Sequence, residues 1–363
     1  MWIHPAVLPY LTAFAIAAVV SWMSIPLVRF WGLRAGVIDR PNERKMHLTP
    51  VVRIGGISIF FGCLCALLLV WALGGFVDER GQPLSSAKDY EIWGVTLGGA
   101  AFFALGLADD LLQLSPVLRL LWQLAIAAGA WVVGVRIEFI SVPWWDIIRF
   151  PEWVSLPITM IWLAGMANAI NWIDGLDGLA AGVTLIASAV IFVASLFVKQ
   201  PSAALIAAAL AGGCIGFLRY NFKPNSRAEI FMGDGGANYL GFTLAGVSVL
   251  GLVKSVTTIA VILPYLILAV PILDATSVIF ERLRRGQSPM KPGKDHLHHR
   301  LIHAGLSQRM TVLFIYSLTL WVGTLALAVS GMPAGGTYAV LSTLLLLYVL
   351  WQVWRRISTS TRN

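Results

Sequence analysis

Eleven apolar segments, most of them close to 20 residues long, follow one another along almost the whole of this 363-residue chain. About 20 apolar residues suffice for a helix to cross the hydrocarbon core of a bilayer. Only 12% of the residues are charged, whereas soluble domains carry about 25%. The sequence therefore predicts an all-α, polytopic helical bundle in a lipid bilayer. The expected spans are 7–28, 54–75, 92–108, 118–138, 155–172, 178–198, 202–220, 236–253, 257–279, 311–330 and 335–354.

The basic residues are distributed unevenly between the two sides of the predicted bundle. If the N-terminus lies outside, the inner loops and tail contain 20 of the 26 Lys and Arg residues. Because cytoplasmic loops are enriched in Lys and Arg, we expect the N-terminus outside and the C-terminus inside. The basic residues behind the net charge of +8 lie mainly in these loops between apolar segments. We therefore expect no nucleic-acid partner. We treat residues 1–363 as a single integral membrane domain.

Polar residues that need an explanation gather at the inner ends of the spans. In ANAINWIDGLDGLAAG, the residues Asn168, Asn171, Asp174 and Asp177 recur at every third position. Residues three apart on a helix lie on overlapping faces, and the glycines that follow each aspartate favour a turn. The spacing predicts a helix end that opens into a turn and directs four side chains into one pocket. A purely structural cap and turn is the alternative.

Two further acidic motifs lie on the same side. Asp109 and Asp110 end the third span. Adjacent carboxylates repel each other, and such a pair suits a proton acceptor beside a metal ion or other cation. A solvated helix end is the alternative. Asp234 lies in the glycine-rich stretch FMGDGG before the eighth span. Hard oxygen ligands of this kind fit Mg²⁺, which prefers to share its site with phosphates.

Basic residues accompany the acidic motifs in two inner loops. The loop 291–303 contains His296, His298, His299 and Arg300. Imidazolium and guanidinium groups donate hydrogen bonds to phosphate oxygens, so we interpret this loop as a phosphate- or diphosphate-binding strip, with a zinc site or a solvated loop as alternatives. The first inner loop contains Lys45 and His47, for which an anionic lipid headgroup is as good a ligand as a substrate.

As a set, these motifs resemble those of the polyprenyl-phosphate N-acetylhexosamine-1-phosphate transferases. The matching stretches are KMHLTPVVRIGG, DDLLQLSPVLRLLWQ, NAINWIDGLDGLAAG, AEIFMGDGGANYLGF and PILDATSVIFERLRRGQSPMKPGKDHLHHRL. They follow the family's order in a core at 45–309, which leaves 311–354 as terminal spans. The stretch HLHHRL is similar to the histidine motif of one branch of this family, the undecaprenyl-phosphate GlcNAc-1-phosphate transferases. The alternative branch is phospho-MurNAc-pentapeptide translocase.

The resemblance implies a reaction, a cofactor and a location. Undecaprenyl phosphate would attack a UDP-N-acetylhexosamine, with GlcNAc as the default sugar, and UMP would be released as lipid-linked surface polysaccharide synthesis begins. The metal would be Mg²⁺, for which Mn²⁺ can substitute. The enzyme would lie in the plasma (inner) membrane with its active site on the cytoplasmic face, and a homodimer is left open.

The resemblance also implies roles for individual residues. Asp234 would be a metal ligand, with Asn171 as a second candidate. Asp109 would act as a base toward the lipid phosphate, with Asp110 beside it. Asp174 and Asp177 would hold the nucleotide or the outer shell of the metal. Direct attack and an aspartyl-phosphate intermediate both remain open. The expected substrate-binding residues are Lys45, His47, Asn168, His296, His298, His299 and Arg300.

A protein of a different class, an ion-coupled transporter, also places carboxylates in membrane helices. Such a transporter would carry polar residues near the midpoints of its spans and on both faces of the membrane. Here they lie at span ends and on one face, which favours an enzyme.

Overall fold

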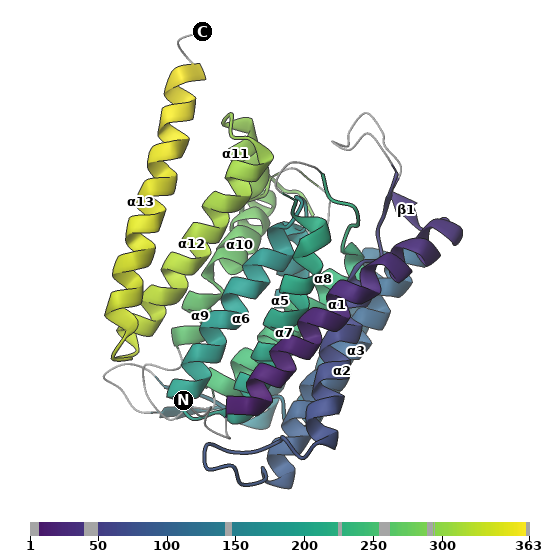
Figure 1. Cartoon of the computed structure of the whole chain (residues 1–363), viewed down its shortest axis with the longest axis vertical. Coiled ribbons are helices and arrows are strands. Elements are labelled where there is room, and N and C mark those ends of the chain that lie inside the picture. The colour runs from purple at the N-terminus through teal and green to yellow at the C-terminus, as the bar shows by residue number, and fades with distance from the viewer. Residues whose placement is uncertain are drawn as a thin grey trace.

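The computed structural model describes residues 7–39, 50–141, 147–223, 227–253, 262–288, 293 and 295–360. Helices dominate this part of the chain and run side by side as a bundle (Figure 1). The first half contains α1 (Leu8–Arg34), α2 (Gly56–Ala72), α3 (Ser86–Leu112), α4 (Pro116–Val132), α5 (Glu152–Ile173) and α6 (Leu179–Phe197). The second half contains α7 (Pro201–Asn221), α8 (Gly233–Ser248), α9 (Ile262–Ile267), α10 (Ala269–Arg284), α11 (Leu297–His303), α12 (Gln308–Val329) and α13 (Gly335–Ser360).

Strands are short and peripheral in the described part of the chain. β1 (Ile38–Asp39) pairs antiparallel with β2 (Val51–Val52). β3 (Phe139–Ser141) pairs in the same way with β4 (Ile147–Arg149). The prediction of an all-α, polytopic membrane bundle is therefore confirmed in its coarse form.

Seven of the described helices are long and apolar enough to cross a membrane: α1, α3, α5, α6, α7, α12 and α13. α2 and α4 are apolar but shorter. The predicted span 236–253 corresponds to α8 and a π-helical continuation over Val249–Val253, and the predicted span 257–279 begins outside the described residues. A total of eleven spans stays a prediction, as does the orientation. The start of α1 and the end of α13 lie at opposite ends of the bundle (Figure 1), as an odd number of crossings requires.

Helix α8 lies in the interior of the bundle and packs against α2, α3 and α5. Its first turns approach two neighbouring helices so closely that side chains would not fit. A Cβ on Gly56 of α2 would overlap the backbone of Gly236, and a Cβ on Gly106 of α3 would overlap the backbone at Asp234. Small residues let membrane helices pack backbone against backbone, so the glycines place Asp234 directly beside the end of α3.

The segment before α8 is fixed to the end of the first inner loop. The Phe231 N–H donates to the carbonyl of Val52, and the N–H groups of Gly55 and Gly56 donate to the carbonyls of Phe231 and Met232, all at 2.8 Å. These bonds place the start of α8 beside the start of α2 and bring Arg53 close to the acidic residues.

Candidate active site

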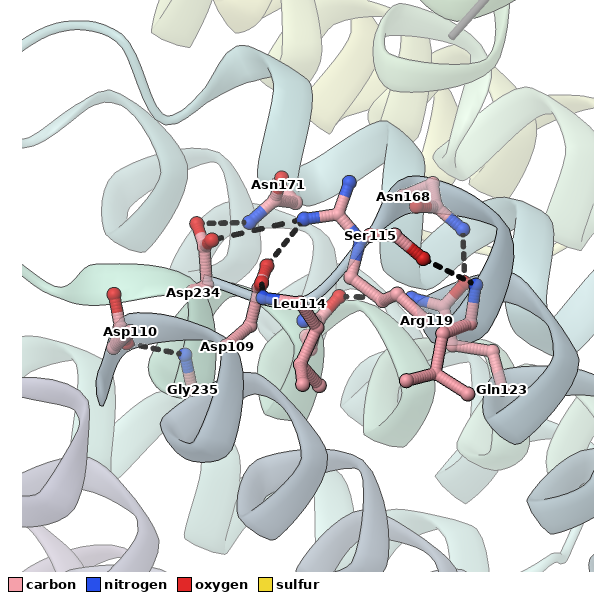
Figure 2. A network of polar contacts seen from close by, with 12 residues as sticks. Asp109, Asp110, Leu114, Ser115, Arg119, Gln123, Asn168, Asn171, Asp234 and Gly235 are labelled. Atoms are coloured by element: carbon pink, nitrogen blue, oxygen red, sulfur yellow. Dashed lines mark hydrogen bonds and ion pairs between the residues drawn. The ribbon is translucent and has the colours of Figure 1, made fainter. Parts of the chain in front are cut away.

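Three helix ends bring three carboxylates and one amide together (Figure 2). Asp109 and Asp110 lie in the last turn of α3, Asn171 lies in the last turn of α5, and Asp234 lies in the first turn of α8. The Asn171 amide donates to Oδ1 of Asp234 at 2.8 Å. Oδ2 of Asp110 accepts the N–H of Gly235 at 3.0 Å. The predicted acidic motifs therefore converge, although they are far apart in the sequence.

Arg119 is the cation at the centre of this cluster (Figure 2). Its Nη1 lies 2.5 Å from Oδ2 of Asp109 and 3.7 Å from Oδ2 of Asp234. The guanidinium thus bridges α3 and α8. The sequence motifs indicated no role for Arg119, although the stretch DDLLQLSPVLRLLWQ contains it.

The short connection between α3 and α4 explains how Arg119 reaches the cluster. Gln113 ends α3 in the left-handed conformation, with φ of 53°. Ser115 then caps α4, and Pro116 occupies its first turn. Oδ1 of Asp109 accepts the N–H of Leu114 at 2.8 Å, which folds the chain back. The Ser-Pro pair marks a helix start and could have indicated that Arg119 lies one turn inside a helix adjacent to α3.

A polar pocket of about 540 Å³ opens beside the cluster. Its acidic lining consists of Asp110, Asp174, Asp177 and Asp234, with Asp39 at one side. Burial raises the pKa of Asp174 to about 8, and the negative charges of Asp234, Asp110 and Asp177 add to the effect. A carboxyl group surrounded in this way favours a cation in the pocket. The basic residues that line the same pocket are Arg53, Arg227, His299 and His303.

The turn between α5 and α6 presents Asp174 and Asp177 to the pocket. Oδ2 of Asp177 accepts the N–H of Ala228 at 3.0 Å. Gly178, which caps α6 with φ of 82°, donates its N–H to Oδ1 of Asn221 at 2.7 Å. Asn221 in turn donates to the carbonyl of Ile230 at 2.8 Å. The turn is therefore held from α7 and from the segment before α8.

Asn168 does not line the polar pocket with the other three residues of the predicted series. It donates to Oε1 of Gln123 at 2.7 Å, and Gln123 lies 3.4 Å from Oδ1 of Asn238. Asn168, Gln123 and Arg119 form the polar end of a second, largely apolar groove of about 690 Å³ between α4, α5, α9 and α10. Of the predicted series, Asn171, Asp174 and Asp177 line the polar pocket, and Asn168 lines the apolar groove.

The residues of the histidine segment differ in their burial and in their contacts. Nδ1 of the buried His296 lies 2.8 Å from Oδ2 of Asp274, at the end of the ninth predicted span. His298 is 1% exposed, and burial lowers its pKa to about 4. His299 lines the polar pocket, whereas Arg300 is exposed. The substrate-binding roles of these residues stay predictions, and Lys45 and His47 lie outside the described residues.

No group of three or more His, Cys, Asp or Glu side chains within the described ranges is arranged to hold a metal ion. Mg²⁺ does not need such a cage, because it usually keeps several waters and binds through one or two carboxylates and the phosphates of a substrate. Asp234 and its hydrogen-bonded neighbour Asn171 fit that donor set.

Comparison with known proteins identifies the family. A sequence profile described as glycosyl transferase family 4 matches residues 92–252. A probable undecaprenyl-phosphate N-acetylglucosaminyl 1-phosphate transferase of Bacillus subtilis is 37% identical over 304 residues, covering 84% of this chain and 80% of the relative. A decaprenyl-phosphate N-acetylglucosaminephosphotransferase of Mycolicibacterium smegmatis is 34% identical, covering 85% and 79%. An undecaprenyl-phosphate alpha-N-acetylglucosaminyl 1-phosphate transferase of Escherichia coli is 28% identical, covering 78% and 73%.

The fold and the site define a multi-pass membrane protein in which an arginine that lines an apolar groove lies 3.7 Å from an aspartate that lines a charged pocket. The chain belongs to glycosyl transferase family 4, and within that family it is similar to the polyprenyl-phosphate GlcNAc-1-phosphate transferases. The resemblance of the sequence motifs to that branch is thereby confirmed.

The raised pKa of Asp174 predicts how stability depends on pH. The folded protein keeps this proton up to about pH 8, whereas the unfolded chain loses it near pH 4. Between these values the unfolded state binds fewer protons, so the free energy of unfolding falls as pH rises. In chelator-treated full-length protein, the thermal unfolding midpoint should therefore decrease as the pH is raised from about 5 to about 8. In the Asp174→Asn variant, the midpoint should decrease less over the same range. An equal slope in both proteins would contradict this assignment.

Proposed function

We propose that this protein transfers a UDP-linked N-acetylhexosamine 1-phosphate, with GlcNAc-1-phosphate as the first candidate, to undecaprenyl phosphate and releases UMP. One observation carries the proposal: Arg119, which lines the apolar groove, lies 3.7 Å from Asp234, which lines a pocket with acidic and basic walls. A reaction between a nucleotide diphosphate and a lipid phosphate needs these two environments side by side. The activities after which the relatives are named support the GlcNAc donor and the polyprenyl acceptor.

The polar pocket suits the nucleotide-sugar donor. Arg53 and Arg227 enter it from two different segments, and His299 enters it from α11. These groups can donate hydrogen bonds to diphosphate oxygens. Asp174 and Asp177 lie on the turn at its edge, where we assign them to the nucleotide end or to the waters around the metal.

Mg²⁺ is the proposed cofactor, and Mn²⁺ would substitute for it. Asp234 would hold the ion, with Asn171 beside it, because the donor sugar's phosphates complete the oxygen ligands that Mg²⁺ prefers. When bound, the ion would neutralise the diphosphate and the charge that develops as the phosphoryl group is transferred. The repulsion among the carboxylates around Asp174 supports a cation at this point.

The apolar groove suits the polyprenyl chain, and its polar end suits the phosphate. The second pKa of a phosphate monoester is about 6, so the acceptor is largely ionised at neutral pH and needs a positive partner more than it needs a base. Arg119 lies at that end of the groove. Asp109, which is paired with Arg119, would orient the acceptor phosphate and take its remaining proton, with Asp110 beside it on the pocket side.

In the proposed reaction an oxygen of the acceptor phosphate attacks the β-phosphorus of the donor. The bond from that phosphorus to the bridging oxygen breaks, and UMP leaves with the oxygen. We favour direct attack because Arg119 of the groove lies 3.7 Å from Asp234 of the pocket, so that the two substrate phosphates would lie close together without a carrier residue between them. All the residues proposed here come from one chain, so a homodimer is compatible with the site but is not required by it.

The distribution of Lys and Arg supports an inner location for the site. We place it on the cytoplasmic face of the plasma (inner) membrane, where lipid-linked surface polysaccharide synthesis would begin. α11, whose His299 lines the pocket, lies at the same end of the bundle as the last turns of α13 (Figure 1), and the sequence predicts an inner C-terminus.

The direct test is an assay of the purified full-length protein. With undecaprenyl phosphate, UDP-GlcNAc and Mg²⁺, it should release UMP and form a lipid-diphosphate sugar. A chelator should abolish release, and Mg²⁺ or Mn²⁺ should restore it. Asp234→Asn should lower turnover about a hundredfold or more, the scale of losing an electrostatic group in the transition state, while thermal unfolding stays similar.

Several outcomes would contradict the proposal. Rescue by zinc alone would overturn the metal assignment, and a near-normal rate in Asp234→Asn would remove that residue as the ligand. Turnover of only UDP-MurNAc-pentapeptide would indicate the translocase branch. Solute flux into sealed vesicles without any UMP release would indicate a transporter.

The acceptor role of Arg119 predicts a selective effect on the lipid substrate. Arg119→Gln removes the cation at the end of the groove, so the KM for undecaprenyl phosphate should rise about tenfold or more. The KM for the donor should change less. Steady-state kinetics with each substrate varied in turn checks this. Arg136→Gln is the matched control, because Arg136 lies at the opposite end of α4, over the Trp131 ring, and should have no effect. A larger rise in the donor KM would contradict the assignment.

A further inference from the structure

The turn that carries Asp174 and Asp177 is also held by a helix from outside the motif-bearing core. α12 packs along α6 (Figure 1) and contributes Tyr316, whose hydroxyl donates to the carbonyl of Gly178 at 2.5 Å. The same glycine donates its N–H to Asn221 of α7. The backbone at Gly178 is thus bound at both its N–H and its carbonyl by side chains from two different helices.

The sequence of α6 makes room for this contact. A Cβ on Gly182 would overlap the hydroxyl and ring of Tyr316, so only glycine at this position lets the phenol reach the first turn of the helix. The carbonyl of Gly178 also accepts the helical bond from the N–H of Gly182 at 2.8 Å. The phenol therefore adds a second donor to a carbonyl that already has its helix partner.

The ring and the hydroxyl of Tyr316 have separable roles. The ring packs against Phe222, with centroids 5.9 Å apart, and contributes to packing whether or not the hydroxyl is present. The hydroxyl makes the bond that fixes the carbonyl one residue after Asp177. Because Asp177 and Asp174 line the polar pocket, a shift of this turn would move both carboxylates relative to a bound nucleotide.

We propose that Tyr316 is a positioning residue for the donor side of the reaction: through Gly178 it holds the turn that presents Asp174 and Asp177. The inference rests on the proposed function, since it assigns the polar pocket to the nucleotide sugar. It also makes α12 part of the support of the active site. The apolar groove is lined by α4, α5, α9 and α10, so acceptor binding should not depend on Tyr316.

The test is Tyr316→Phe in the full-length protein, which keeps the ring and removes only the hydroxyl. The KM for UDP-GlcNAc should rise about three- to tenfold, the range expected for one lost hydrogen bond. The concentration of UMP that gives half-inhibition should rise in parallel. The KM for undecaprenyl phosphate and the thermal unfolding midpoint should stay close to wild type. Tyr348→Phe, the same change on α13, is the matched control and should leave every value unchanged.

Two results would overturn the positioning role. One is an unchanged donor KM in an active Tyr316→Phe enzyme. The other is a loss of turnover with both KM values unchanged and a lower unfolding midpoint, which would make the hydroxyl a general structural contact. A wild-type protein that releases UMP from no UDP-sugar is a different failure. That result would overturn the proposed function itself, and this inference with it.

Discussion

Repulsion among carboxylates is the constraint on which the site depends. The ends of α3 and α5 and the start of α8 bring Asp109, Asp110, Asp174 and Asp234 close together. Two like charges 4 Å apart repel by about 4 kcal/mol in an effective dielectric of about 20, so such a cluster persists only with cations beside it or with a carboxyl group protonated. Arg119 supplies one between Asp109 and Asp234. Asp174, whose pKa is raised to about 8 by burial and by its acidic neighbours, marks the side where a further cation belongs.

The fold supplies the rigidity that this concentration of charge needs. α8 approaches α2 and α3 backbone to backbone at Gly236 and Gly106, which leaves the start of the helix little room to move away. Arg119 lines the apolar groove and lies 3.7 Å from Asp234, which lines the polar pocket, so the two cavities lie close together at this end of α4. Under the proposed function, an aqueous diphosphate and a membrane-bound phosphate would meet here without either one leaving its own environment.

The sequence predicted the helices well because a backbone in lipid has almost no alternative to a helix. It also predicted that the acidic motifs converge, since their spans end on one side. The three-residue spacing wrongly predicted that Asn168 shares a pocket with the other three residues. Each three-residue step along a helix rotates the side chain by about 60°, and Asn168 therefore faces the apolar groove. Asp174 and Asp177 lie beyond the end of α5. Arg119, Gln123 and Tyr316 went unassigned because single polar residues in helices form no pattern, and their partners come from other helices.

The central claim is that the carboxylate cluster binds one divalent cation, with Asp234 as a ligand. Electron paramagnetic resonance of Mn²⁺ titrated into the purified full-length protein tests it without any substrate turnover. The account predicts one bound Mn²⁺ per chain, displaced by Mg²⁺ and lost in Asp234→Asn. Absence of bound Mn²⁺ in the wild type both with and without UDP-GlcNAc, or equal binding after Asp234→Asn, would contradict it.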